Sequence, residues 1–360
     1  MAPSLTPQRH PASPRWISAI ASRRLDTRTL TAEEAVALRE HGLAGEAAAC
    51  VDATSAGPTR AEQVLLDARR ADALASLAVA ATARKAAALL TEARLPFLVL
   101  KGPGLAALTT GTWQGRGGVD IDLLIAPSRV AEAHTLLIDA RLRRYDGRTA
   151  SPGALYRWAF PEMAYVGWPV EVDLHWGLDH SPGMCRLPFE ALLERAHPFD
   201  LDGVPLRTLG VIDAWLFTAV HGGRSFWNRW KWLLDAWRQW HALSPEQRDA
   251  TRTAARAAGC AKACADAEAL VWWCAQDLDE ISPSTPIPSH VALPLARAAR
   301  LLNRTRVASG VAFTMLKGLQ RRTDHMALAP TPLVALDSLT RSIARLVLAA
   351  PAYRNPALRG

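Results

Sequence analysis

The hydrophobic pattern of the chain changes twice, from helical periodicity to short apolar runs and back. Apolar residues recur every three or four positions over residues 59–93, which predicts a long amphipathic helix. A shorter helix should begin near Thr31, whose hydroxyl precedes two acidic residues. Residues 1–28 open with a stretch rich in Pro, Ser and Arg, and we expect a flexible lead there. Residues 29–94 are then a set of N-terminal helices.

Short apolar runs dominate the next part of the chain, residues 95–186. Three clear runs and two weaker ones predict strands at 95–100, 119–125, 169–176, 142–145 and within 156–166. Pro127 opens a helix that should reach about residue 141. This mixture predicts a small mixed β-sheet with helices flanking it.

Helical periodicity returns after Leu187 and continues almost to the end of the chain. Helices are predicted at 188–196, 209–221, 226–242, 246–258, 261–278, 289–303 and 332–349. The predicted fold class is therefore α+β, with an αβ core at 95–186 and a mostly helical C-terminal domain at 187–360. Five tryptophans should pack this domain against the sheet: Trp227, Trp230, Trp232, Trp237 and Trp240.

Composition excludes several classes of protein. Apolar residues make up 49% and charged residues 21% of the chain, as in ordinary globular proteins. The net charge of +8 is scattered, without a basic run that would mark a nucleic-acid arm. We found neither a signal-peptide core nor a charge-free apolar run near the length of a membrane span, so a cytoplasmic protein without a membrane partner is expected. The five cysteines suggest buried free thiols rather than disulfides or a zinc site.

Two aspartates interrupt the apolar run at 119–125. Residues i and i+2 of a strand point to the same face, so Asp120 and Asp122 should stand roughly 6–7 Å apart at Cα, while Ile121 faces the core. Like charges at that spacing repel each other unless a cation lies between them. Magnesium is the natural cation, because it takes oxygen ligands and keeps positions open for substrate phosphates.

A third carboxylate lies on the last predicted strand. Asp173 shares one face with Glu171 and His175, while Val172 and Leu174 point to the other. If this strand pairs beside the first, three acids form one cluster. Such a cluster can hold two Mg²⁺ ions, or Mn²⁺ in their place, in the arrangement that serves phosphoryl transfer.

A glycine turn precedes the acidic strand by about fifteen residues. Lys101, Gly102 and Gly104 follow the strand at 95–100, just before a helical pattern. Backbone N–H groups at such a turn attract phosphate, and the Lys101 ammonium adds positive charge. Arg116, just before the acidic strand, could reach the same phosphates.

In combination these motifs resemble the nucleotidyltransferase superfamily of the DNA-polymerase-β type. The resemblance covers about residues 60–245 and is greatest to an uncharacterised bacterial branch. It rests on five motifs: Leu100-Lys101-Gly102, Arg116, Asp120-Ile-Asp-Leu-Leu124, Asp173-Leu-His-Trp176, and His221 followed by Trp230-Lys-Trp232 and Asp235. It implies catalytic and metal-binding roles for Asp120, Asp122 and Asp173, and nucleotide binding by Lys101, Gly102, Gly104 and Arg116.

The chain departs from the family pattern in two places. Pro103 replaces the usual serine of the glycine turn, which leaves phosphate binding to the backbone and Lys101. Asp173 replaces the glutamate usual in the branch, and an aspartate still coordinates a metal with a shorter reach. His175, His221 and Asp235 are accessory candidates. His221 and Asp235 could form a substrate-side acid–base pair or a buried hydrogen-bonded pair that joins two helices.

The resemblance implies an enzyme that transfers a nucleoside monophosphate from an NTP to an unidentified acceptor and releases pyrophosphate. A small molecule or peptide is favoured as acceptor over nucleic acid, because no basic-aromatic patch is concentrated in the sequence. Two alternatives stay open: a catalytically degenerate binding module, and a toxin or antitoxin enzyme that acts on tRNA or protein. The sequence does not determine the NTP or the oligomeric state.

Overall fold

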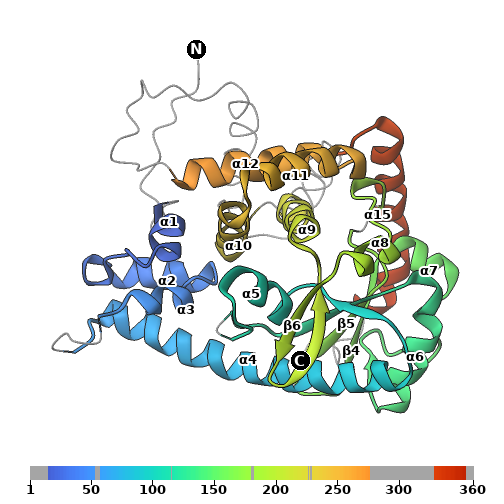
Figure 1. Ribbon diagram of the computed structural model, residues 1–360. Coiled ribbons are helices and arrows are strands. Elements are labelled where there is room, and N and C mark those ends of the chain that lie inside the picture. Colours follow the sequence, from blue (N-terminus) through green and yellow to red (C-terminus); the bar gives the residue numbers. More distant parts are fainter. Residues whose placement is uncertain are drawn as a thin grey trace.

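A seven-stranded mixed sheet forms the centre of the protein, shown as a computed structural model in Figure 1. The structure describes residues 15–52, 57–114, 116–179, 182–225, 227, 229–275 and 328–353. In spatial order the strands are β3 (Arg143–Arg144), β4 (Glu162–Val166), β5 (Glu171–His175), β2 (Asp120–Ile125), β1 (Phe97–Val99), β7 (Val204–Thr208) and β6 (His197–Leu201). The β2–β5 and β1–β7 pairs are parallel and the others antiparallel.

Helices precede, interrupt and follow the sheet. Those before and within it are α1 (Arg15–Ala21), α2 (Ala32–Glu40), α3 (Ala44–Ala47), α4 (Arg60–Glu92), α5 (Pro103–Thr110), α6 (Val130–Asp139), α7 (Ala154–Ala159) and α8 (Phe189–Glu194). Those after it are α9 (Val211–Arg224), α10 (Trp230–Ala242), α11 (Pro245–Ala258), α12 (Ala261–Ala275) and α15 (Pro332–Tyr353). The α+β class predicted from the sequence is confirmed, and the predicted helix at 289–303 lies outside the described residues.

Alternation along β2 gives the sheet two different faces. Ile121 and Leu123 pack into a core shared with α4 and α6. Leu124 packs on the opposite face, in a core that includes Phe217 of α9. In Figure 1, α4 runs along one side of the sheet and the α9–α12 group lies on the other. The two aspartates of β2 therefore face the layer of C-terminal helices.

The long helix α4 begins with a capping box. The Thr59 hydroxyl accepts from the Glu62 N–H, and the Glu62 carboxylate accepts from the Thr59 N–H. Among the described residues, α4 alone is long and apolar enough to cross a membrane by length and composition. Part of its apolar surface, including Val79 and Ala83, is buried in the core beneath the sheet. A core helix satisfies the same criteria, so this finding is weak evidence for a membrane span.

The sheet extends past the predicted domain boundary at residue 187. The segment after α8 forms the hairpin β6–β7, and β7 joins β1 through the pairing of Thr208 with Val99. The sequence analysis predicted a mostly helical region here and left 197–208 between two helices without an element, so it missed this hairpin. The missed signal is the Asp202-Gly203 turn, where both residues have the positive φ that tight hairpin turns require.

The predicted flexible lead at 1–28 is wrong for its described part. Helix α1 buries Trp16, Ile17 and Ile20 in the core of N- and C-terminal helices. Hydrophobic burial of this kind overrides the polar composition around it. Residues 1–14 lie outside the described residues.

The tryptophans also pack differently from the prediction. Trp227, Trp230 and Trp240 belong to a core that joins α1–α4 to α9, α10 and α12, rather than to the sheet. Trp232 and Trp237 pack against the same core from its edge. The core between the sheet and the helical layer instead contains smaller apolar residues, among them Leu124 of β2 and Phe217 of α9.

Candidate active site

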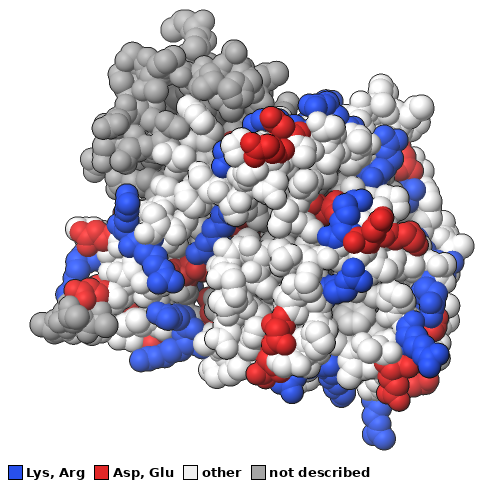
Figure 2. All heavy atoms as spheres, in the orientation of Figure 1, with Lys and Arg blue, Asp and Glu red and all other residues white. Residues whose placement is uncertain are grey.

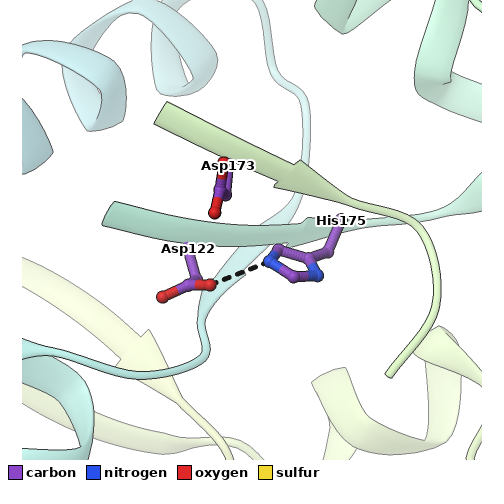
Figure 3. A group of neighbouring side chains, drawn as sticks. All are labelled: Asp122, Asp173 and His175. Carbon is purple, nitrogen blue, oxygen red and sulfur yellow. Dashed lines mark hydrogen bonds and ion pairs between the residues drawn. The ribbon is translucent and has the colours of Figure 1, made fainter. Parts of the chain in front are cut away.

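The three predicted acids lie on adjacent strands. In the parallel β2–β5 pair Asp122 lies directly opposite Asp173, and Asp120 lies opposite Glu171. Residues directly opposite each other on paired strands point to the same face, so these four carboxylates share one face of the sheet. Figure 3 shows Asp122 and Asp173 on the two strands, with the His175 ring beside them. The strand pairing on which the three-acid cluster depended is therefore present.

Asp122 is at the centre of a hydrogen-bonded charge cluster and is 2% exposed. Its Oδ1 lies 2.6 Å from Lys101 Nζ and 2.9 Å from His175 Nε2. Burial alone would raise the pKa of the Asp122 carboxyl, but the Lys101 ammonium and the His175 ring hold that pKa well below its usual range. The Asp122 carboxylate in turn raises the pKa of Lys101 against the effect of burial.

Glu162 of β4 completes the cluster from the far side of His175. Its Oε2 lies 3.1 Å from His175 Nδ1, so the ring is held between two carboxylates. Although burial lowers the pKa of His175, Glu162 and Asp122 raise it above its usual value. The imidazolium form, which donates from both nitrogens, is thereby favoured.

Neighbouring positive charges offset the charges of Asp120 and Asp173 much less than that of Asp122. Burial and the neighbouring Asp122 charge raise the pKa of Asp120. The same two causes raise the pKa of Asp173 to about 8. Asp173 shares a hydrogen bond with Glu171, whose pKa is also raised, chiefly by burial. This face of the sheet therefore has an excess of negative charge that a bound cation would relieve.

The donor set at this position fits a metal ion. Ligand atoms of Asp122, Asp173 and His175 lie within 4.8 Å of one another. Carboxylate oxygens suit Mg²⁺ and Mn²⁺, whereas His175 would bind a softer divalent metal only after its ring loses the proton that its two carboxylate neighbours favour. Asp120 lies on the same face of β2 but outside this compact group, so two of the three predicted metal-binding acids are brought together most closely.

The glycine turn follows β1 and begins α5. Gly102 is the N-cap with φ +55°, a conformation that glycine adopts readily, and Pro103 occupies the first helical position. Gly104 packs closely, because a Cβ there would lie 2.6 Å from Thr208 Oγ1. The Gly104 N–H donates to Lys101 O at 3.2 Å, and Pro103 has no N–H. The prediction of phosphate binding thus depends mainly on Gly102 and the positive end of the helix.

Arg116, predicted to reach phosphates, pairs with another predicted residue. Its guanidinium donates to Asp235 of α10, with Nη2–Oδ2 at 2.6 Å and Nε–Oδ1 at 3.2 Å. His221 instead packs edge-on against Trp232, with ring centroids 4.8 Å apart. The proposed pairing of His221 with Asp235 was therefore wrong, because Arg116 takes the carboxylate. Burial and the Lys101 charge lower the pKa of His221 well below its usual value, so its ring is neutral.

Two polar side chains near the site were missed by the sequence analysis. Lys231 Nζ lies 3.5 Å from Gly117 O, and Ser76 Oγ of α4 accepts from the Gly117 N–H at 3.3 Å. Lys231 stands in the quoted Trp-Lys-Trp motif, which was a usable signal. Nothing in the local pattern of α4 marks Ser76 as functional.

A small hollow lies beside the glycine turn, between α4 and the loop that leads to β2. Its lining consists of Ser76, Val79, Gly102, Pro103, Trp113, Arg116, Gly117 and Gly118. Trp113 was not among the predicted site residues, because a single tryptophan in a loop carries no distinctive spacing. The hollow therefore adds one aromatic ring to the surroundings of Gly102 and Arg116.

The acids paired across parallel strands, with a glycine turn beside them, are the arrangement that the resemblance to nucleotidyltransferases implied. The family described as "Uncharacterised nucleotidyltransferase" matches residues 33–276, and the chain belongs to it. The match is longer than the 60–245 expected from the motifs, and it confirms the resemblance. Membership makes the protein a nucleotidyl transferase in general terms.

Other comparisons add little. No curated protein matches the chain. Among solved structures, the antibiotic-resistance factor ANT(2'')-Ia is similar at 17% identity, over 49% of this chain and 91% of that one, with a TM-score of 0.36.

Proposed function

We propose that the protein transfers a nucleoside monophosphate from an NTP to an acceptor, with release of pyrophosphate and dependence on Mg²⁺. The observation that carries the proposal is the direct opposition of Asp122 and Asp173 across β2 and β5. Burial, and after it the Asp122 charge, raises the pKa of Asp173 to about 8, so keeping both carboxylates ionised at this position is costly. A cation and a substrate that bridges it would offset the repulsion.

The residues of the site would have different roles in this reaction. Asp120, Asp122 and Asp173 would hold the metal, which supplies charge neutralisation at the triphosphate when bound. Asp122 is oriented by its contacts with Lys101 and His175. The Asp173 carboxylate would accept the proton of the attacking acceptor group. Gly102 and the N-terminal end of α5 would bind phosphate oxygens.

A small molecule or a peptide is the acceptor class we propose. On the face shown in Figure 2, basic and acidic side chains of the described residues lie interspersed. Binding of nucleic acid depends on concentrated positive charge, which that face lacks among these residues. We propose a cytoplasmic location for the same reaction.

The experiment is a screen for pyrophosphate release across the four NTPs and panels of small-molecule and peptide acceptors. Wild-type protein should release pyrophosphate with at least one pair when Mg²⁺ is present, and chelation should abolish release. Asp173→Asn should lose the activity while it keeps most of the NTP affinity. Glu190→Gln, which changes an exposed acid on α8, is the matched control and should behave as wild type. Release that survives both Asp173→Asn and chelation would contradict the proposal.

A further inference from the structure

Three buried cysteines from two distant segments lie together, away from the acidic site. The N–H of Arg186 donates to Ala258 O at 2.9 Å, which brings Cys185 beside the turn between α11 and α12. Cys260 occupies that turn, and Cys264 lies one helical turn further along α12, with its N–H on Cys260 O at 3.1 Å. Each of the three cysteines is 5% exposed or less.

The three thiols form a hydrogen-bonded chain with Cys260 in the middle. Cys185 and Cys264 both donate to the Cys260 sulfur, which lowers the pKa of Cys260 to about 4. The pKa values of the two donors are raised well above the usual range, first by these same hydrogen bonds and then by burial. Cys260 also directly precedes Ala261, the first residue of α12, where the helix dipole favours negative charge.

We propose that Cys260 is an oxidation site, which a hydroperoxide converts into a disulfide with Cys185. The arrangement meets the requirements of such a site, because the backbone contacts of Arg186 and Cys264 gather three buried sulfurs, Cys260 lies next to the start of α12, and a second thiol is near enough to resolve the first product. These cysteines lie in a different part of the molecule from the acids of β2 and β5, and their oxidation does not depend on nucleotidyl transfer.

The chemistry balances in two steps. The Cys260 thiolate attacks one peroxide oxygen, an S–O bond forms and the O–O bond breaks, which leaves a sulfenic acid on Cys260 and hydroxide. The Cys185 sulfur then attacks the Cys260 sulfur, an S–S bond forms, and the hydroxyl leaves with the Cys185 proton as water. One thiolate and one thiol are oxidised, and one hydrogen peroxide is reduced to one hydroxide and one water.

Geometry selects Cys185 over Cys264 as the second partner. A disulfide needs Cβ atoms about 3.5–4.5 Å apart. Residues four apart on a helix have Cβ atoms roughly 5–6 Å apart, so a Cys260–Cys264 bond would distort the start of α12. Cys185 approaches from a separate segment and is free of that constraint. Cys264 therefore remains a thiol, and its hydrogen bond lowers the pKa of Cys260.

Burial limits the oxidant to a small one. Cys260 is 1% exposed, so a bulky thiol reagent or glutathione disulfide has no direct path to its sulfur, whereas a peroxide is little larger than water. The product would tie the segment that precedes α8 to the start of α12.

Two other cysteines provide controls within the same chain. Cys50 is more exposed than Cys260, but burial of its sulfur raises its pKa. Cys274 is buried, and burial raises its pKa to a value above the usual range. If exposure decided the rate of oxidation, Cys50 would be oxidised before Cys260. If thiolate character decides it, Cys260 is oxidised first.

The test treats the reduced full-length protein with hydrogen peroxide, blocks remaining thiols after unfolding, and maps the peptides by mass spectrometry. A linked Cys185–Cys260 peptide should appear while Cys50 is still a thiol, and dithiothreitol should reverse it. Cys274→Ser should form the same link. Oxidation of Cys50 with Cys260 left intact, or a Cys260–Cys264 link, would overturn the proposal.

Two variants separate the steps. Cys185→Ser should abolish the link and leave a Cys260 sulfenic acid that dimedone traps; a variant that forms neither product would also overturn the proposal. Cys264→Ala removes one thiol donor, so the oxidation rate of Cys260 should fall several-fold at pH 6 and much less at pH 8.

Two thiols and three carboxylates affect the protonation of the three cysteines and therefore the pH comparison. Cys185 and Cys264 contact Cys260 directly. Asp179 and Asp213 act electrostatically on Cys185, and Glu268 acts on Cys264. All three carboxylates remain in the Cys264→Ala variant, so a rate that keeps the wild-type pH profile would contradict the thiolate assignment.

Discussion

Arg116 and Asp235 form a bidentate ion pair across 119 positions of the chain, and their side chains are 13% and 6% exposed. Arg116 lies in the loop that leads into β2, and Asp235 lies in the middle of α10. The pair therefore fixes the entry to the acidic strand against the helical layer. This contact gives Arg116 a positioning function that the phosphate-binding prediction did not contain.

Removing one partner of this pair should be costly. Asp235→Asn leaves the Arg116 guanidinium buried without its counter-charge, and we expect a loss of about 3–5 kcal/mol in the free energy of unfolding. The double variant Arg116→Met with Asp235→Leu should recover most of the loss, because it buries no charge. Urea unfolding of the three proteins measures both values. Equal stability of Asp235→Asn and wild type would show that the pair has no structural role.

Lys101 should stabilise the metal-free protein through Asp122. Lys101→Met keeps much of the side-chain length but removes the ammonium 2.6 Å from Asp122 Oδ1, and we expect a loss of about 1–3 kcal/mol. Mg²⁺ should then raise the Tm of the variant more than that of wild type, since Asp122 carries an uncompensated charge. Lys85→Met removes an exposed lysine over Trp168 and is the control. Identical Tm values with and without Mg²⁺ in both proteins would contradict this role.

Lys231 should make stability depend on pH above neutrality. Burial and the Arg116 charge lower its pKa from 10.5 to about 8. Between these values the unfolded chain binds the proton that the folded protein lacks, so stability rises as pH increases through this window. Relative to Lys231→Met, wild type should gain up to about 3 kcal/mol from pH 8 to pH 10.5. Urea unfolding of both proteins across this range measures the difference, which a pH-independent offset would contradict.

Gly104 should tolerate no side chain. A Cβ at this position would lie 2.6 Å from Thr208 Oγ1 and 2.9 Å from Val99 O, so α5 and β7 would have to separate. We expect Gly104→Ala to lose about 1–3 kcal/mol of stability and to displace Lys101 from Asp122. Gly118→Ala places its Cβ in ordinary contact, 3.5 Å from Val79 Cγ2, and should be nearly neutral. Similar Tm values for the two variants would refute the packing argument.

Much of the acidic face was predictable because strand geometry is local. Alternation places Asp173 and His175 on one face and Val172 on the other, whatever the strand pairs with. The same rule placed Asp120 beside Asp122. Helix starts at Thr31 and Thr59 were predictable for a similar reason, since a capping box involves residues only three positions apart.

The sequence by itself thus determined which residues are acidic, which face they share and where most elements begin. Only the tertiary structure decided their partners: Asp173 opposite Asp122, Glu162 on His175, Arg116 on Asp235, and Cys185 beside Cys260. Local periodicity follows from backbone geometry within a few residues, whereas these contacts join residues up to 119 positions apart. They depend on how strands pair and how helices bury apolar surface, which no spacing along the chain records.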